Sequence, residues 1–178
     1  MRNPRVPDRI TSPVRRLCNR IAPGTLPLFV KVCPEADANS QDCFINVENK
    51  VKKSGGKIQY GWAIWYVPGL LMEAEFHSVW LSPEGNYIDV SPNEFSFSEI
   101  MFLPDPHRVY AGRQIDNIRI PLNKNPQVKE FIRLHEAKFK VLNEGELATR
   151  HGAVSVPSEK IRPIIERLAQ LSIDLDKE

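Results

Sequence analysis

Apolar residues recur at helical spacing in four segments of the chain. The pattern predicts helices over residues 12–21, 40–54, 126–144 and 158–171. Ser12, Ser40 and Asn125 stand where the first three begin, and such side chains can accept a hydrogen bond from a backbone N–H of the first turn. A proline follows Ser12 and Asn125 at the first helical position, which strengthens both assignments.

Two of these helices have a predicted inward face. In the second helix this face consists of Phe44, Val47 and Val51, and Gly55-Gly56 ends the helix. In the last helix the expected apolar face consists of Ile161, Ile164, Ile165, Leu168 and Leu171.

Strand patterns occupy the segment between the second and third helices. Residues 57–67 and 70–81 are rich in aromatic and β-branched residues, and Pro68-Gly69 forms the turn between them. Residues 28–32 predict a further strand. Periodicity is lost after Asp89 as far as residue 107, and residues 109–122 predict one or two short strands. An antiparallel meander is therefore expected after the second helix.

This order of elements predicts the fold class α+β, with a cysteine-bearing helix packed on a twisted antiparallel sheet and covered by C-terminal helices. We expect residues 1–178 to form one domain, because this length suits a single hydrophobic core. Within it, residues 1–26 form a basic, proline-rich arm with a short helix, 27–122 the helix and sheet core, and 123–178 the C-terminal helices.

Charge and composition narrow the classes of function. The net charge of +2 is too small for the whole chain to bind a polyanion. Residues 1–31 hold seven basic residues and one acid, so any nucleic-acid contact is expected only at the N-terminal arm, whose arginines should face solvent. No apolar stretch would span a bilayer or serve as a signal peptide, so a cytoplasmic protein without membrane contact is expected. The sequence leaves the oligomeric state open.

The three cysteines do not form a disulfide or zinc pattern, since they are odd in number and lack CxxC spacing. Cys18 and Cys33 are expected to be buried. Cys43 falls in the first turn of the second helix, where the unpaired N–H groups and the helix dipole favour a thiolate.

Candidate partners for this thiol lie in the segment HSVWLSPEGNYIDVSP. A three-residue hairpin loop with Gly85 in the left-handed position would pair Ser82 with Asn86. That register places His77 and Asp89 on one face as diagonal neighbours, whereas a two-residue loop would separate them. A carboxylate orienting an imidazole beside a thiol is the arrangement used in nucleophilic catalysis.

Other residues are candidates for stabilising an oxyanion or for binding a metal ion. The backbone N–H of Cys43 and the side-chain amides of Gln41 and Asn39 are the local oxyanion donors. Glu75 is expected either to support the site residues as a neighbouring carboxylate or to contact a substrate amine. Glu73, Glu75 and His77 share one face of a strand, and Asp105 and His107 are two more potential ligands. The HExxH and CxxC spacings are absent, so no metal is expected, and Glu73 is expected to be solvated. No motif indicates a nucleotide, and no cofactor is expected.

Aromatic residues are candidates for the wall of a groove. These are Trp62, Trp65 and Trp80. By strand parity Tyr60, Trp62, Ile64 and Tyr66 share one face and Trp65 lies on the other, so one set should belong to the core.

The cysteine at a helix start, the histidine on a strand and the aspartate on the next strand resemble the papain-like superfamily, in its transglutaminase-like and cell-wall-endopeptidase branches. The resemblance covers about residues 39–92. CFINV, YGWAIW, EAEFHSVW and IDVSP together resemble a block of uncharacterised bacterial proteins, some of which carry a zinc-binding SEC-C tail. This chain has no such cysteine-rich tail, so no metal is implied.

The resemblance implies thiol-dependent acyl chemistry on an amide or ester through Cys43, His77 and Asp89. Peptidase, amidase, deamidase and acyl or amine transferase activities all remain open, with a peptide or another amide as substrate. Two alternatives stand beside it. One is a non-catalytic papain-like binding module whose basic arm contacts an anionic partner. In the other, Cys43 and His77 are ordinary structural residues.

Overall fold

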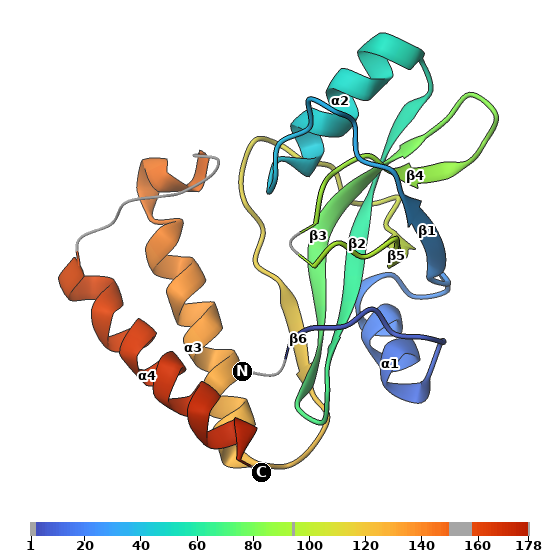
Figure 1. Ribbon diagram of the computed structural model, residues 1–178. Coiled ribbons are helices and arrows are strands. Elements are labelled where there is room, and N and C mark those ends of the chain that lie inside the picture. Colours follow the sequence, from blue (N-terminus) through green and yellow to red (C-terminus); the bar gives the residue numbers. More distant parts are fainter. Residues whose placement is uncertain (1–2, 94, 150–157, 178) are drawn as a thin grey trace.

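A computed structural model describes residues 3–93, 95–149 and 158–177 (Figure 1). Its helices are α1 (Ser12–Ile21), α2 (Cys43–Ser54), α3 (Pro126–Leu142) and α4 (Ser158–Asp176), with a short 3-10 helix η1 (Gly145–Thr149). Its strands are β1 (Leu28–Val32), β2 (Lys57–Val67), β3 (Leu71–Leu81), β4 (Tyr87–Asp89), β5 (Glu99–Pro104) and β6 (Ile118–Pro121). The predicted α+β class is confirmed.

The strands form one sheet in the order β2-β5-β1-β4-β3-β6. The long hairpin partners β2 and β3 also pair with each other, so five of the strands close into a small barrel. One pair departs from the predicted antiparallel sheet: β1 and β4 are parallel, with Lys31 opposite Ile88. A parallel pair needs a long crossover connection, and α2 with the β2–β3 hairpin supplies it.

Strand β5 was not predicted by the sequence pattern. Four consecutive residues, Ile100 to Leu103, are almost fully buried because β5 lies between β1 and β2 and is covered on both faces. A strand buried on both faces has no alternation of apolar and polar residues, so periodicity does not reveal it.

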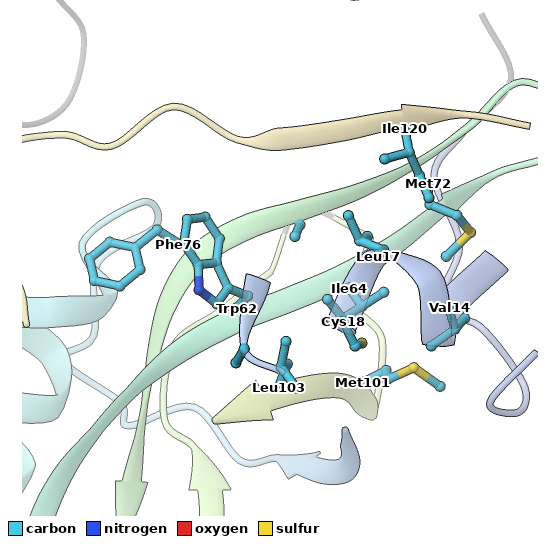
Figure 2. Close-up of a cluster of buried hydrophobic side chains, with 12 residues drawn as sticks. Val14, Leu17, Cys18, Trp62, Ile64, Met72, Phe76, Met101, Leu103 and Ile120 are labelled. Atoms are coloured by element: carbon cyan, nitrogen blue, oxygen red, sulfur yellow. The ribbon is translucent and has the colours of Figure 1, made fainter. Parts of the chain in front are cut away.

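Helix α1 packs its apolar side against the outer face of the barrel. Val14, Leu17 and Cys18 of α1 meet Trp62 and Ile64 of β2 in a fully buried cluster (Figure 2). The described arginines of residues 1–20 are exposed, as predicted, and Arg2 lies outside the described residues. The N-cap of α1 is Thr11 rather than Ser12.

Helices α3 and α4 pack against each other and against the turn between β2 and β3. Val67, Leu70 and Leu71 of that turn region join the apolar faces of both helices in one buried cluster. The Asn125 side chain caps α3 by accepting a hydrogen bond from the N–H of Gln127 at 2.8 Å, as predicted. The predicted end at residue 144 was too late, since α3 ends at Leu142.

The predicted apolar face of α4 was partly wrong. Ile165 is 47% exposed, whereas Leu168, Leu171 and Leu175 are buried and Ile164 packs beside them. These four residues follow one another at intervals of three or four, which keeps them on one side of the helix. Ile165 lies about 100° further round and faces away from α3.

Candidate functional site

Cys43 is the first residue of α2. Asp42 rather than the predicted Ser40 occupies the N-cap position. Gln41 lies in the left-handed region with φ of 64°, a conformation that few non-glycine residues adopt, and it turns the chain sharply into the helix. The helix ends at Ser54, and Gly55 follows as the C-cap with φ of 71°, which fits the predicted end. The Cys43 N–H therefore belongs to the first turn, where N–H groups have no partner within the helix.

The hairpin between β3 and β4 has the predicted register. Ser82 N–H donates to the Asn86 carbonyl at 2.9 Å, and Trp80 pairs with Ile88. Gly85 takes the left-handed position at φ of 86°. The three-residue loop therefore places His77 and Asp89 on the same face.

His77 and Asp89 form a hydrogen-bonded pair. The Nε2–H of His77 donates to Oδ2 of Asp89 at 3.0 Å, and the N–H of Ser91 donates to Oδ1 of Asp89 at 2.9 Å. The side chains of Asp89 and His77 are only 3% and 14% exposed. Both carboxylate oxygens are thus held in place, and the aspartate in turn fixes the imidazole ring.

Cys43 lies close to the same imidazole. It is near enough for its charge and hydrogen bonding to act on the pKa of His77. Cys43, His77 and Asp89 also line one cavity, so the structure brings these residues together from α2, β3 and β4.

Opposing effects set the pKa of His77. Burial of the imidazole is the largest, and alone it would lower the pKa because the charged form loses hydration. Charge interactions with Asp89 and Cys43, together with hydrogen bonding, act in the other direction and hold the pKa of His77 well above its usual value. The site therefore favours the protonated form of the His77 imidazole at neutral pH.

Asn46 and Ser91 support this arrangement, and the sequence reasoning missed both. Asn46, 5% exposed, accepts from the N–H of Asn39 at 3.0 Å and donates to its carbonyl at 2.8 Å. It also donates to the Ser91 hydroxyl at 3.1 Å. A polar residue beside Val47 on the inward face of a helix was the available signal.

Tyr110 is a further residue that the sequence did not indicate. Its ring stacks on Phe44 with centroids 4.0 Å apart and planes 3° apart. Burial raises the pKa of the Tyr110 phenol, and the charges of Cys43 and Asp42 raise it further. The phenol is therefore a protonated hydroxyl close enough to Cys43 to sense its charge.

A cavity of about 510 Å³ opens at the three side chains. The predicted Gln41, Glu75 and Trp65 line it together with Cys43 and His77. The loop after β4 contributes Pro92, Asn93 and Phe95, and the end of α3 contributes Phe139, Leu142 and Asn143.

Three predicted site residues lie elsewhere. Asn39 is exposed and outside the cavity, and its backbone is bound to Asn46. Trp62 is fully buried in the core (Figure 2). Its indole N–H donates to Asp105 at 3.0 Å. Trp80 is 9% exposed and donates to the Gly55 carbonyl at 2.9 Å. The prediction of Trp62 and Trp80 as groove walls was wrong because their strand face is covered by α1 and α2.

The carboxylates considered as metal ligands have other partners. Glu73 forms an ion pair with Arg119 at 2.9 Å, so it is not simply solvated. Asp105 accepts from Trp62 and from the N–H of His107. Within residues 3–93, 95–149 and 158–177, no group of three or more potential ligands is arranged to hold a metal ion.

The other two cysteines differ from the predictions in part. Cys18 is 2% exposed, as predicted, and burial raises the pKa of its thiol to about 11. Cys33 is exposed rather than buried, because the chain leaves the sheet at the end of β1. Cys33 therefore provides an accessible thiol away from the cavity.

Comparisons with known proteins identify no relative. No family model matches the chain, no curated protein matches it, and no solved structure matches it. Among the described residues, no helix combines the length and apolarity that a membrane crossing requires.

Proposed function

We propose that this protein is a thiol-dependent acyl-transfer enzyme acting on an amide or ester through Cys43, His77 and Asp89. The observation that carries the proposal is the meeting of thiol, imidazole and buried carboxylate at the wall of one cavity, with the imidazole hydrogen-bonded to the carboxylate. A structural role for these residues would not require them to meet at a cavity.

In the proposed reaction the Cys43 thiolate attacks the substrate carbonyl carbon. The new S–C bond moves the carbonyl electrons onto oxygen, where the N–H of Cys43 and the Gln41 amide are the candidate donors. The His77 imidazolium then protonates the leaving amine or alcohol as its bond to carbon breaks. The product at this stage is a thioester on Cys43.

The thioester is then resolved by a second nucleophile. His77, now neutral, accepts a proton from water or from an amine as it attacks the thioester carbon, and the Cys43 thiolate leaves. Water gives hydrolysis, and an amine gives transfer. Asp89 stays ionised throughout and holds the imidazole orientation.

The papain-like character of the core is part of this proposal. It is supported by a cysteine at a helix start beside a small barrel, with the histidine and aspartate on two neighbouring strands. The alternative, a non-catalytic module with the same groove, predicts a Cys43 that can be replaced without loss and that has no special reactivity.

The test measures alkylation of native protein by iodoacetamide as a function of pH, with each cysteine quantified by mass spectrometry. Exposed Cys33 serves as the reference thiol within the same molecule. We expect Cys43 to react at least about tenfold faster than Cys33 at pH 6, because a neighbouring imidazolium stabilises the thiolate. His77→Ala should remove this advantage and leave Cys33 unchanged. Equal rates at Cys43 and Cys33, or the same advantage in His77→Ala, would contradict the proposal.

A further inference from the structure

The cavity reaches from Cys43 to a buried apolar cluster between four strands of the barrel. Ala63 of β2 and Ile100 of β5 belong to this cluster, and both line the cavity. In the β2–β3 pairing Gly61 lies opposite His77, so Ala63 is the diagonal neighbour of His77 at about 7–8 Å. The cavity therefore has an apolar floor close to the imidazole, at a distance that one side chain of a bound molecule spans.

Two aromatic side chains line the same cavity. Trp65 follows Ala63 by two residues and shares its face of β2, and the indole N–H of Trp65 donates to Oε2 of Glu75 at 2.8 Å. Phe95 comes from the loop after β4. The Phe97 ring connects them, with its centroid 5.9 Å from that of Trp65 and 5.6 Å from that of Phe95. The three rings thus form one aromatic wall, and a hydrogen bond fixes the orientation of the indole.

The loop holds Phe95 in an exposed position. The side-chain amide of Asn93 binds the backbone of Phe97 twice: it donates to the carbonyl at 3.0 Å and accepts from the N–H at 2.8 Å. Ser96 adopts a φ of 53°, which turns the chain sharply after Phe95. Phe95 is 41% exposed. Single exposed apolar residues are common on protein surfaces, but Phe95 lies on a loop that is held in place and borders a cavity, so its ring is available to a ligand.

The polar lining of the cavity favours an uncharged ligand group. Among the described residues that line it, three are acidic and none is a lysine or an arginine. Glu73 is bound by Arg119 and Asn117, at 2.9 and 2.8 Å, and Asp89 is bound by His77. The lining therefore offers an acidic side chain neither a lysine nor an arginine, whereas the apolar floor and the rings suit a neutral one.

We propose that the cavity selects acyl substrates whose side chain next to the reacting carbonyl is a neutral aromatic group of the benzyl type. The inference rests on the proposed function at Cys43. The aromatic group lies on Ala63 and Ile100 and packs against the rings of Trp65 and Phe95, which together form the apolar subsite. An aromatic group gains both from burial of its large apolar surface and from offset or edge contacts with other rings.

The first experiment tests the apolar subsite without any chemistry at Cys43. Phenylacetamide, with acetamide as the match that lacks the ring, is titrated into the protein. The indole N–H signal of Trp65 is followed by NMR and assigned with Trp65→Phe. We expect a saturable shift with phenylacetamide, no comparable shift with acetamide, and a much weaker effect in Phe95→Ala. Leu26→Ala removes an exposed apolar side chain outside the cavity and should behave like the unchanged protein.

The second experiment connects the apolar subsite to the thiol in a Cys33→Ser background. The reagents are the chloromethyl ketones of N-acetylphenylalanine and N-acetylalanine. The Cys43 thiolate attacks the methylene carbon, so that a C–S bond forms while the C–Cl bond breaks and chloride leaves. We expect the ratio of rates, phenylalanine reagent over alanine reagent, to fall about fivefold in Phe95→Ala and to stay constant in Leu26→Ala. Phe95→Tyr keeps the ring and should keep the ratio.

The two proposals fail in different ways. A slow reaction of Cys43 with both ketones counts against the thiol chemistry, and the NMR titration still decides the apolar subsite. The apolar subsite is overturned by a rate ratio that is unchanged in Phe95→Ala or that falls equally in Leu26→Ala or Phe95→Tyr. It is also overturned if phenylacetamide shifts the indole signal no more than acetamide does, or equally in Phe95→Ala.

Discussion

Replacing Asn46 with alanine tests whether one buried amide holds the site together. Its side chain makes three hydrogen bonds, two to the backbone of Asn39 and one to the hydroxyl of Ser91. Asn39 precedes Cys43 in the chain, and the N–H of Ser91 binds Asp89. Asn46 therefore links the segment that precedes Cys43 with the segment that holds the carboxylate of Asp89.

The expected loss follows from these three bonds. Each hydrogen bond contributes about 0.5–1.5 kcal/mol net to the free energy of unfolding, and alanine leaves the bonding groups of Asn39 and Ser91 without this partner. Alanine also has a higher helix propensity than asparagine, which returns about 0.5 kcal/mol. Asn46→Ala should therefore lower the free energy of unfolding by about 2–3 kcal/mol.

The matched control is Asn49→Ala, which makes the same substitution at an exposed position of α2. Urea unfolding of both variants separates the lost bonds from the change in helix propensity. Alkylation of Cys43 relative to Cys33 supplies a second readout, because a loosened Asn39 segment should reduce the advantage of Cys43. If the two variants unfold within about 0.5 kcal/mol of each other, Asn46 does not hold the site as argued.

Two further predictions concern stability. Burial, with the nearby charges of Arg119 and Lys138, lowers the pKa of His135 to about 4. In the unfolded chain the imidazole takes up a proton near pH 6.5. The folded protein keeps His135 neutral to a lower pH, so its free energy of unfolding is unaffected by this group above pH 6.5 and falls by up to about 3 kcal/mol as the pH falls toward 4. Urea unfolding at pH 7 and pH 5 should show a smaller acid loss in His135→Gln, and an equal loss would refute the assignment. Gly61→Ala should prevent or severely weaken folding, because the added Cβ would clash with the Leu103 carbonyl and the Phe102 ring. Gly24→Ala meets no atom within 4 Å and is strained only by its φ of +82°, so it should cost much less, and similar melting of both variants would contradict this.

Local signals were sufficient for the helices, the long hairpin and the register between β3 and β4. The cap-then-proline pattern located α3, and Gly55 located the end of α2. Gly85 in a three-residue loop fixed the register of β3 and β4, and with it the shared face of His77 and Asp89. These features depend on residues close in sequence, so a single chain reveals them.

Long-range packing decided what the sequence left open. The pattern grouped Trp62, Trp65 and Trp80 as groove residues, but α1 and α2 cover the faces of Trp62 and Trp80, and only Trp65 reaches the cavity. The role of Asn46 is also tertiary, since its partner Ser91 lies 45 residues away. Which aromatic or polar side chain meets the cavity depends on which face another element covers.

The sequence by itself thus determined the local framework of this protein: a cysteine in the first turn of a helix and a histidine and aspartate brought to one face by a short turn. Only the tertiary structure placed β5 within the sheet, made β1 and β4 parallel, and brought Cys43 to His77 beside the carboxylate of Glu75. The physical reason is that turns and caps are set by neighbouring residues, whereas the barrel closes through contacts between distant segments that no local pattern records.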